Sequence, residues 1–126
     1  MIRRAVQTDM PQLVQMVQEY YRQQEYQDRS NIPSLPSDVS VLARKAIQDH
    51  IVVVNEQEGV LTGVVAGAVV PWLVNHQETA AQEFIAYGEG VAELRSVFDR
   101  VAKHRGAKAS LLSCFLPHPG NRMRKL

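Results

Sequence analysis

The sequence of 126 residues predicts a single α/β domain, in the broad α+β sense, from three observations. Apolar residues recur at helical spacing in residues 9–24, 38–49 and 91–105. A β-branched run at residues 51–54 leads through a turn into a second extended segment. The length suits one domain with its own core, and 45% hydrophobic against 21% charged residues is a globular composition.

The first half of the chain has the pattern strand, helix, loop, helix. A short strand at residues 2–5 precedes the pair Thr8–Asp9, whose side chains can cap a helix over residues 9–24 by accepting an orphan backbone N–H. Prolines and turn-forming residues make residues 28–36 a loop. A second helix is then predicted over residues 38–49.

An antiparallel hairpin follows the second helix. We expect residues 51–54 to pair with residues 60–70, where Gly63 and Gly67 indicate a bulge or a close backbone approach. Residues 71–79 read as a polar connection between this hairpin and the next strand.

The last part of the chain predicts a strand at residues 80–87, a helix at 91–105 and a strand at 108–115. Gly106 is the expected C-terminal cap of the helix. A helical connection between two strands of one sheet normally makes them parallel, so we expect these strands to lie side by side.

Composition and charge exclude several classes of function. A formal net charge of +1 provides no basic field of the kind that nucleic acid requires, so we expect no nucleic-acid partner. No apolar run approaches the ~20 residues of a membrane span, and the start of the chain lacks a signal-peptide core. We therefore expect a cytoplasmic protein without a membrane partner.

The single cysteine, Cys114, excludes an intrachain disulfide and a paired-cysteine metal site. Its apolar neighbours predict a buried, inert thiol, and we expect no metal. Arg122, Arg124 and Lys125 crowd the C-terminal end. They read as a frayed, solvated terminus or as a basic contact for an acidic surface.

The segment with the clearest chemistry is a strand, a glycine-containing turn and a helix within residues 82–94. A turn that feeds a helix start exposes backbone N–H groups at the positive end of the helix dipole, and Gly88 and Gly90 would let a pyrophosphate come close. The same segment also suits an ordinary connection. The full dinucleotide fingerprint and the lysine-containing phosphate loop are both missing from it.

Three local patterns carry a resemblance to a known family. Residues 9–13 match D-x-P-x-L after the first strand, residues 61–67 look like the strand pattern I-V-G-x-x-x-G, and residues 87–92 fit R/Q-x-x-G-x-G/A at the glycine and alanine positions. Together with the order of elements, these patterns resemble the GNAT N-acetyltransferases over nearly the whole chain. The resemblance is to short GNAT proteins carried by bacteria and their phages.

The resemblance implies a mixed, mainly antiparallel central sheet flanked by helices and truncated at its C-terminal end. It implies an acyl-CoA-dependent N-acetyltransferase, with acetyl-CoA as co-substrate and an amine as acceptor. The residues that it assigns to CoA binding are Phe84, Ile85, Ala86, Tyr87, Gly88, Gly90, Val91, Ala92 and Asn121.

The chain also departs from the family pattern. Tyr87 replaces the usual arginine or glutamine, and Asn121 begins the family's N-x-x-x-x-x-Y pattern one residue too late for the tyrosine that serves as general acid. The family's last two strands are missing from the predicted elements. The strand at residues 108–115 would then be an open apolar edge, so we expect a second copy to cover it in a homodimer or larger homo-oligomer.

The departures leave two functions open. One is the N-acetyltransferase, and the other is a catalytically inactive GNAT-fold protein that acts as a binding or assembly module, encoded for instance by a phage. The resemblance assigns Glu83 as the base, and its alternative is a solvent-facing or edge-strand glutamate. His118 is a candidate to replace the missing tyrosine as acid. Glu89 is expected to face water, because a carboxylate pointing into the turn would repel CoA.

Candidates for acceptor binding lie elsewhere in the chain. His76 and Glu78 either line an acceptor groove or belong to a surface loop. Tyr20, Tyr21 and Tyr26 either contact the acceptor or pack in the core and on an amphipathic surface.

Overall fold

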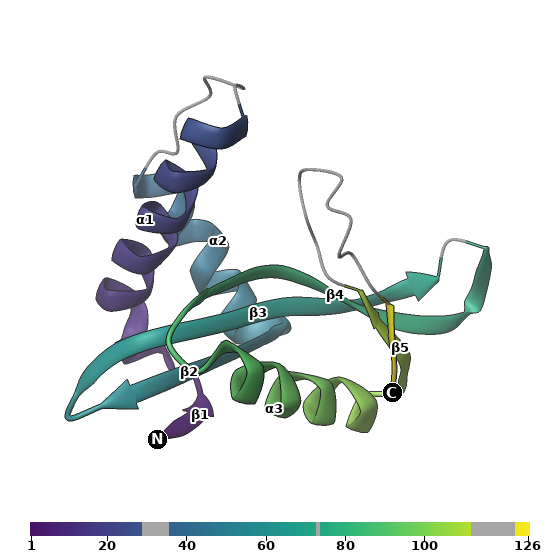
Figure 1. The fold of residues 1–126 in the computed structure, drawn as a ribbon. Helices are drawn as coiled ribbons and strands as arrows, with labels where there is room; N and C mark the ends of the chain where they lie inside the picture. Colours follow the sequence, from purple (N-terminus) through teal and green to yellow (C-terminus); the bar gives the residue numbers. More distant parts are fainter. Residues whose placement is uncertain (29–35, 73, 112–122) are drawn as a thin grey trace.

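The structure is a computed structural model that describes residues 1–28, 36–72, 74–111 and 123–126. Figure 1 shows the path of the chain. In chain order the elements are β1 (Ile2–Arg4), the 3-10 turn η1 (Gln7–Asp9), α1 (Met10–Asp28), α2 (Pro36–Asp49), β2 (Ile51–Gln57), β3 (Val60–Trp72), β4 (Asn75–Gly88), α3 (Val91–His104), β5 (Ala107–Leu111) and β6 (Met123–Lys125).

The strands form one sheet in the order β1-β2-β3-β4-β5-β6. Neighbouring strands pair antiparallel except β4 and β5, which are parallel and joined through α3. The prediction that the strands before and after the third helix lie side by side and parallel is confirmed. So is the mixed, mainly antiparallel sheet.

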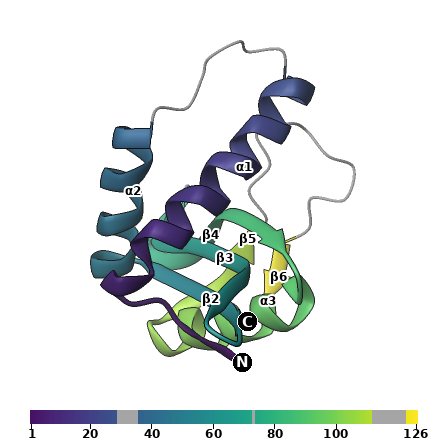
Figure 2. The same ribbon diagram turned by 90° about the vertical axis from the view of Figure 1, so that its left-hand side faces the viewer.

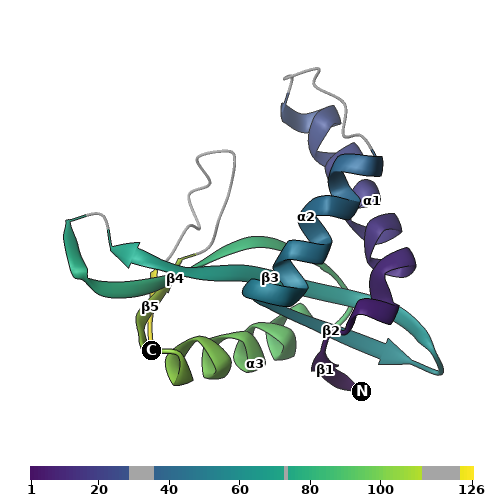
Figure 3. The same cartoon turned by 180° about the vertical axis from the view of Figure 1, so that it is seen from behind.

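Helices cover both faces of this sheet. Figures 1 and 2 place α1 and α2 on one face and α3 on the other, and Figure 3 gives the same arrangement from behind. Within β2, Val52 and Val54 pack toward α1 and α2, whereas Ile51 and Val53 pack toward α3. Residues 51–54 are therefore continuously apolar because both of their faces are buried.

Asp9 organises the start of α1. Its Oδ2 accepts a hydrogen bond from the Val6 N–H at 2.8 Å, and its two carboxylate oxygens accept from the Arg3 guanidinium at 2.8 and 2.9 Å. The predicted cap is met only in part: Asp9 does accept a backbone N–H, but that group belongs to Val6, the N-cap of η1, and Asp9 itself is the last residue of η1. The Arg3 hydrogen bond lowers the pKa of Asp9 below its ordinary value.

Among the described residues, none of the helices combines the length and the apolar character needed to cross a bilayer.

The connection predicted at residues 71–79 is wrong. β3 continues to Trp72 and β4 begins at Asn75, so most of this segment is a long hairpin. Pro71 pairs with Thr79, next to a register irregularity where a proline is tolerated in a sheet. The hairpin projects beyond the helices (Figure 1), so neither of its faces has to be apolar. Its sequence therefore lacks the apolar alternation that would have predicted strands.

The C-terminal residues form β6 rather than a frayed end. β6 pairs antiparallel with β5, opposite residues 109–111. The predicted open edge at residues 108–115 is therefore corrected over the part that the structure describes, because the chain covers β5 with its own last strand. The expected homo-oligomer was based on that open edge, so this argument for it no longer holds, and the oligomeric state stays a prediction.

Candidate functional site

The turn between β4 and α3 is shaped by two glycines. Gly88 has φ +91° and Gly90 has φ +75°, which residues with side chains rarely adopt. The Glu89 N–H donates to the Thr62 carbonyl oxygen at 2.8 Å and ties the turn to β3. The Leu94 N–H donates to the Gly90 carbonyl oxygen at 2.8 Å as α3 begins. The path of the turn is therefore fixed by the positive φ of its glycines and by backbone hydrogen bonds to β3 and within the start of α3.

The start of α3 has the properties of an anion-binding site. The first backbone N–H groups of an α-helix have no acceptor within the helix and lie at the positive end of its dipole. Gly90, Ala92 and Glu93 are exposed, and Val91 is half-buried. A phosphate can therefore approach these groups from solvent.

Close backbone contacts explain the glycines in and opposite the turn. A Cβ at Gly63 would lie 2.2 Å from the Glu89 carbonyl oxygen, and a Cβ at Gly88 would lie 2.2 Å from the Thr62 carbonyl oxygen. The predicted close approach at Gly63 is thus confirmed. A Cβ at Gly90 would lie 2.9 Å from Asn55 Nδ2, so it would point at the protein.

Asn55 is a supporting residue that the sequence did not single out. It is 8% exposed, and its Nδ2 donates to the Glu89 carbonyl oxygen at 3.4 Å. The available signal was a polar residue that ends the apolar run of β2. A change at Gly90 therefore acts on the turn through Asn55.

The pairing of β4 with β5 is described only up to Leu111, the last described residue of β5. Gln82 lies opposite Leu111, whereas the pairing of β4 with β3 continues to Gly88. Within the described residues, the β5 side of residues 83–88 has no strand partner. An extended ligand can add to such a strand edge through main-chain hydrogen bonds.

A bulge in β4 lies just beyond the described pairing with β5. Ile85 pairs with Ala66 and Glu83 with Gly67, so Phe84 is an extra residue in β4. The predicted irregularity at Gly67 is confirmed. A bulge reverses the alternation of side chains along a strand. Glu83 accordingly contacts α3, while Ile85 packs with the core beneath α1 and α2.

Glu83 is buried, so its interpretation as a solvent-facing or edge-strand glutamate is wrong. It is 2% exposed, because β4 lies inside the sheet under α3. Its carboxylate accepts hydrogen bonds from Arg95 on α3, at 3.1 and 3.3 Å from Nε and 2.9 Å from the terminal NH2 group. The sequence did not predict this ion pair, because Glu83 and Arg95 are twelve residues apart and lie on different elements.

The remaining acid–base candidates are dispersed. Glu89 is exposed in the turn, as expected. His76 and Glu78 are exposed near the start of β4, at the opposite end of that strand from the turn. His118 and Asn121 lie outside the described residues, as does Cys114. No group of three or more His, Cys, Asp or Glu side chains that could hold a metal ion occurs in the described part of the chain.

Aromatic contacts attach the end of β4 to α1. Tyr20 packs edge-on against Tyr87 with ring centroids 6.1 Å apart, and against Tyr21 at 5.3 Å. Gln23 Nε2 donates to the Tyr87 hydroxyl at 3.4 Å. The packing interpretation of Tyr20 and Tyr21 is supported, while the side chain of Tyr26 lies outside the description. Tyr87, at the motif's arginine or glutamine position, faces α1.

A cavity lies between α1, α2 and the sheet, next to the bulge. Phe84 and Ile85 of β4 form part of its wall, together with apolar residues of both helices and of β2 and β3. His50, which the sequence did not single out, lies edge-on to Phe84 with ring centroids 6.1 Å apart. Tyr21 also lines the cavity, and burial raises the pKa of its phenol.

Comparison with known proteins agrees with this arrangement. No family model and no curated protein sequence matches the chain. Among solved structures, an acetyltransferase from Vibrio fischeri superposes with a TM-score of 0.72 at 19% identity, covering 98% of both chains. A predicted acetyltransferase of Clostridium acetobutylicum, solved with acetyl-CoA, has a TM-score of 0.68 at 15% identity and covers 90% of this chain and 80% of its own.

A GNAT family acetyltransferase from Staphylococcus aureus superposes with a TM-score of 0.65 at 13% identity, covering 100% of this chain and 98% of its own. This chain has the fold of the GNAT acetyltransferases.

Proposed function

We propose that the protein is an acyl-CoA-dependent N-acetyltransferase that uses acetyl-CoA and an amine acceptor. The observation that carries the proposal is the course of β4. Its pairing with β3 continues to Gly88, and the strand ends in the glycine turn that opens α3. An extended strand that leads directly to an anion-binding helix start suits a ligand with an extended arm and a pyrophosphate.

In this proposal the pyrophosphate binds at the turn. The backbone N–H groups at the start of α3 donate to its oxygens, and the helix dipole favours its negative charge. Gly88 and Gly90 shape the turn, and the small, exposed side chain of Ala92 leaves the approach open.

The arm that joins the pyrophosphate to the sulfur is extended and contains amide groups. It would lie along residues 83–88 of β4 and pair with their backbone on the β5 side, where no strand partner occurs among the described residues. Residues 84–87 thereby acquire the binding role that the family resemblance assigned to them. The thioester would then lie near the bulge at Phe84.

The reaction forms a bond between the amine nitrogen and the thioester carbon and breaks the carbon–sulfur bond. The attacking ammonium group must lose a proton, and the departing thiolate gains one. A backbone N–H at the bulge can polarise the thioester carbonyl. Glu83 and His118 remain the predicted base and acid. The Arg95 ion pair argues that Glu83 also holds β4 against α3.

A charge placed at the start of α3 tests the proposal. Ala92→Glu puts a carboxylate where the pyrophosphate would bind. Two like charges about 6 Å apart repel by roughly 3 kcal/mol at an effective dielectric of 20, so CoA binding should weaken about a hundredfold. The same glutamate should stabilise the helix by ~0.3–1 kcal/mol, so a folding defect would not explain the loss.

Ser96→Glu is the matched control, because Ser96 is exposed on α3 and lies one helical turn beyond Ala92. CoA affinity, measured by calorimetry at physiological salt, should fall about fivefold or less in this variant, since distance and ions screen the added charge. Equal affinities in the two variants would refute a pyrophosphate site here. If the unmodified protein bound no CoA, the inactive binding or assembly module would replace the enzyme.

A further inference from the structure

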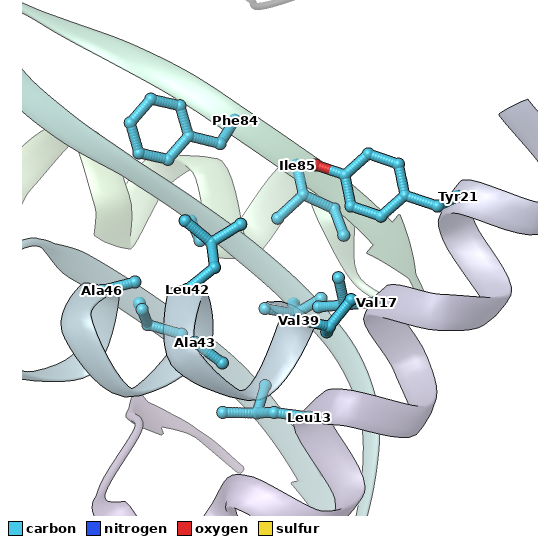
Figure 4. A pocket seen from close by; sticks show the side chains of 12 residues that line it. Leu13, Val17, Tyr21, Val39, Leu42, Ala43, Ala46, Phe84 and Ile85 are labelled. Carbon is cyan, nitrogen blue, oxygen red and sulfur yellow. The ribbon is translucent and has the colours of Figure 1, made fainter. Parts of the chain in front are cut away.

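The cavity beside the bulge has an almost wholly apolar wall. In Figure 4, Val17 and Tyr21 of α1 and Leu42 of α2 face Phe84 and Ile85 of β4 across it. Among the described residues that line it, only Tyr21 carries a polar side-chain atom. The cavity is thus suited to an apolar group and offers almost nothing to a charged one.

The cavity adjoins the proposed CoA site at the bulge. Phe84 and Ile85 belong to the segment of β4 along which the CoA arm is proposed to lie, and the same two residues form part of the cavity wall. A thioester lying near Phe84 would have its carbonyl at the strand edge. The chain beyond that carbonyl could pass the bulge and enter the cavity.

The chemistry of the two substrates decides which of them fits. An amine acceptor is charged before it reacts, and burying an ammonium group without a partner costs several kcal/mol. The acyl chain of a thioester has only carbon and hydrogen beyond its carbonyl, so its burial against these side chains is favourable.

We infer that this cavity binds the acyl chain of the donor, and that the preferred donor is a short-chain acyl-CoA of about four carbons, such as butyryl-CoA. The inference rests on the proposed function and extends its donor beyond acetyl-CoA. The size agrees: the cavity measures about 50 Å³. A water-sized group needs about 10–15 Å³ of such space, so roughly four groups fit.

Binding measurements on the unmodified protein test the inference without knowledge of the acceptor. Calorimetry would compare CoA, acetyl-CoA, butyryl-CoA and hexanoyl-CoA. Each buried methylene changes affinity about fourfold, so butyryl-CoA should bind roughly 15-fold more tightly than acetyl-CoA. Hexanoyl-CoA should bind no more tightly than butyryl-CoA, because the cavity has no room for two more carbons.

Two variants on α2 locate the effect. Ala43→Leu adds bulk to the cavity wall at a half-buried position, and it should reduce the preference for butyryl-CoA to about twofold while CoA itself binds as before. Gln48→Leu adds the same side chain at an exposed position of this helix and should change nothing. If Ala43→Leu does not fold, Leu42→Ala at a 50% exposed position should instead move the preference toward hexanoyl-CoA.

Equal binding of acetyl-CoA and butyryl-CoA, within twofold, would overturn the acyl cavity and leave the proposed function standing. Retention of the full butyryl-CoA preference in Ala43→Leu would overturn it as well. Failure of all four compounds, CoA included, would instead remove the proposed function on which the inference rests.

Discussion

The buried ion pair between Glu83 and Arg95 leads to a quantitative prediction about stability. Three nitrogen–oxygen contacts of 2.9 to 3.3 Å join the two side chains, and Glu83 is 2% exposed. Removing one partner of a buried pair costs roughly 3–5 kcal/mol, because the buried charge that remains loses the opposite charge that compensated it. The Arg95 side chain is 34% exposed, so water can partly replace it. We therefore expect Arg95→Met to lower the free energy of unfolding by about 3 kcal/mol.

Urea unfolding of a double-mutant cycle measures this effect. Arg95→Met should also lower the melting temperature by roughly 10 °C for a domain of this size. The double variant Glu83→Gln/Arg95→Met should lose less than the sum of the single variants, by at least about 1 kcal/mol, because it leaves no buried charge. A coupling free energy below about 0.5 kcal/mol would refute the view that the pair holds β4 to α3.

The same variants separate a structural role of Glu83 from a catalytic one. If Glu83 is the base, Glu83→Gln should abolish thioester consumption while CoA still binds, and Arg95→Met should retain part of the activity because the carboxylate is still present. If the pair only positions β4, both variants should lower the rate alike. Consumption by Glu83→Gln at the unmodified rate would exclude Glu83 as the base.

Two further predictions concern stability. Because the Arg3 hydrogen bond lowers the pKa of Asp9 below 3.8, its contribution is full above that pH and is lost as the pH falls through the lower folded-state pKa. Asp9→Asn should therefore flatten the loss of unfolding free energy between about pH 5 and pH 2, and an unchanged slope would contradict this. Gly67→Ala should cost about 3 kcal/mol in urea unfolding, because its Cβ would lie 2.2 Å from the Gln82 carbonyl oxygen. Gly59→Ala, with φ +83° but no atom within 4 Å of a Cβ, should cost about 1–2 kcal/mol, and equal losses would show that the bulge relaxes.

Local signals were sufficient for most of the fold. The helical spacing of apolar residues placed α1, α2 and α3 within a few residues of their observed ends. The β-branched run of β2 and the turn at Gly59 placed the first hairpin. Gly63 was correctly linked to a close backbone approach, and the helical crossover gave the parallel pair β4 and β5. Each of these features left a signal in residues that are adjacent in the chain.

Long-range packing decided the rest. The hairpin around Trp72 projects from the body, so its exposed residues gave no apolar alternation to detect. β6 is a three-residue strand whose existence depends on β5, far from it in sequence. The burial of Glu83 depends on the bulge at Phe84 and on Arg95 of α3, and no pattern in the sequence relates these residues to one another.

The candidate site also has one part that the sequence determined and another that only the tertiary structure decided. The sequence determined the glycine turn and the helix start, because backbone conformation and the helix dipole follow from residues that are adjacent in the chain. Only the tertiary structure decided that Phe84 forms a bulge in β4, that Asn55 supports the turn, and that a cavity lies beside the bulge. These features arise where α1, α2 and strands distant in sequence meet, and the space they leave depends on how all of those side chains pack together.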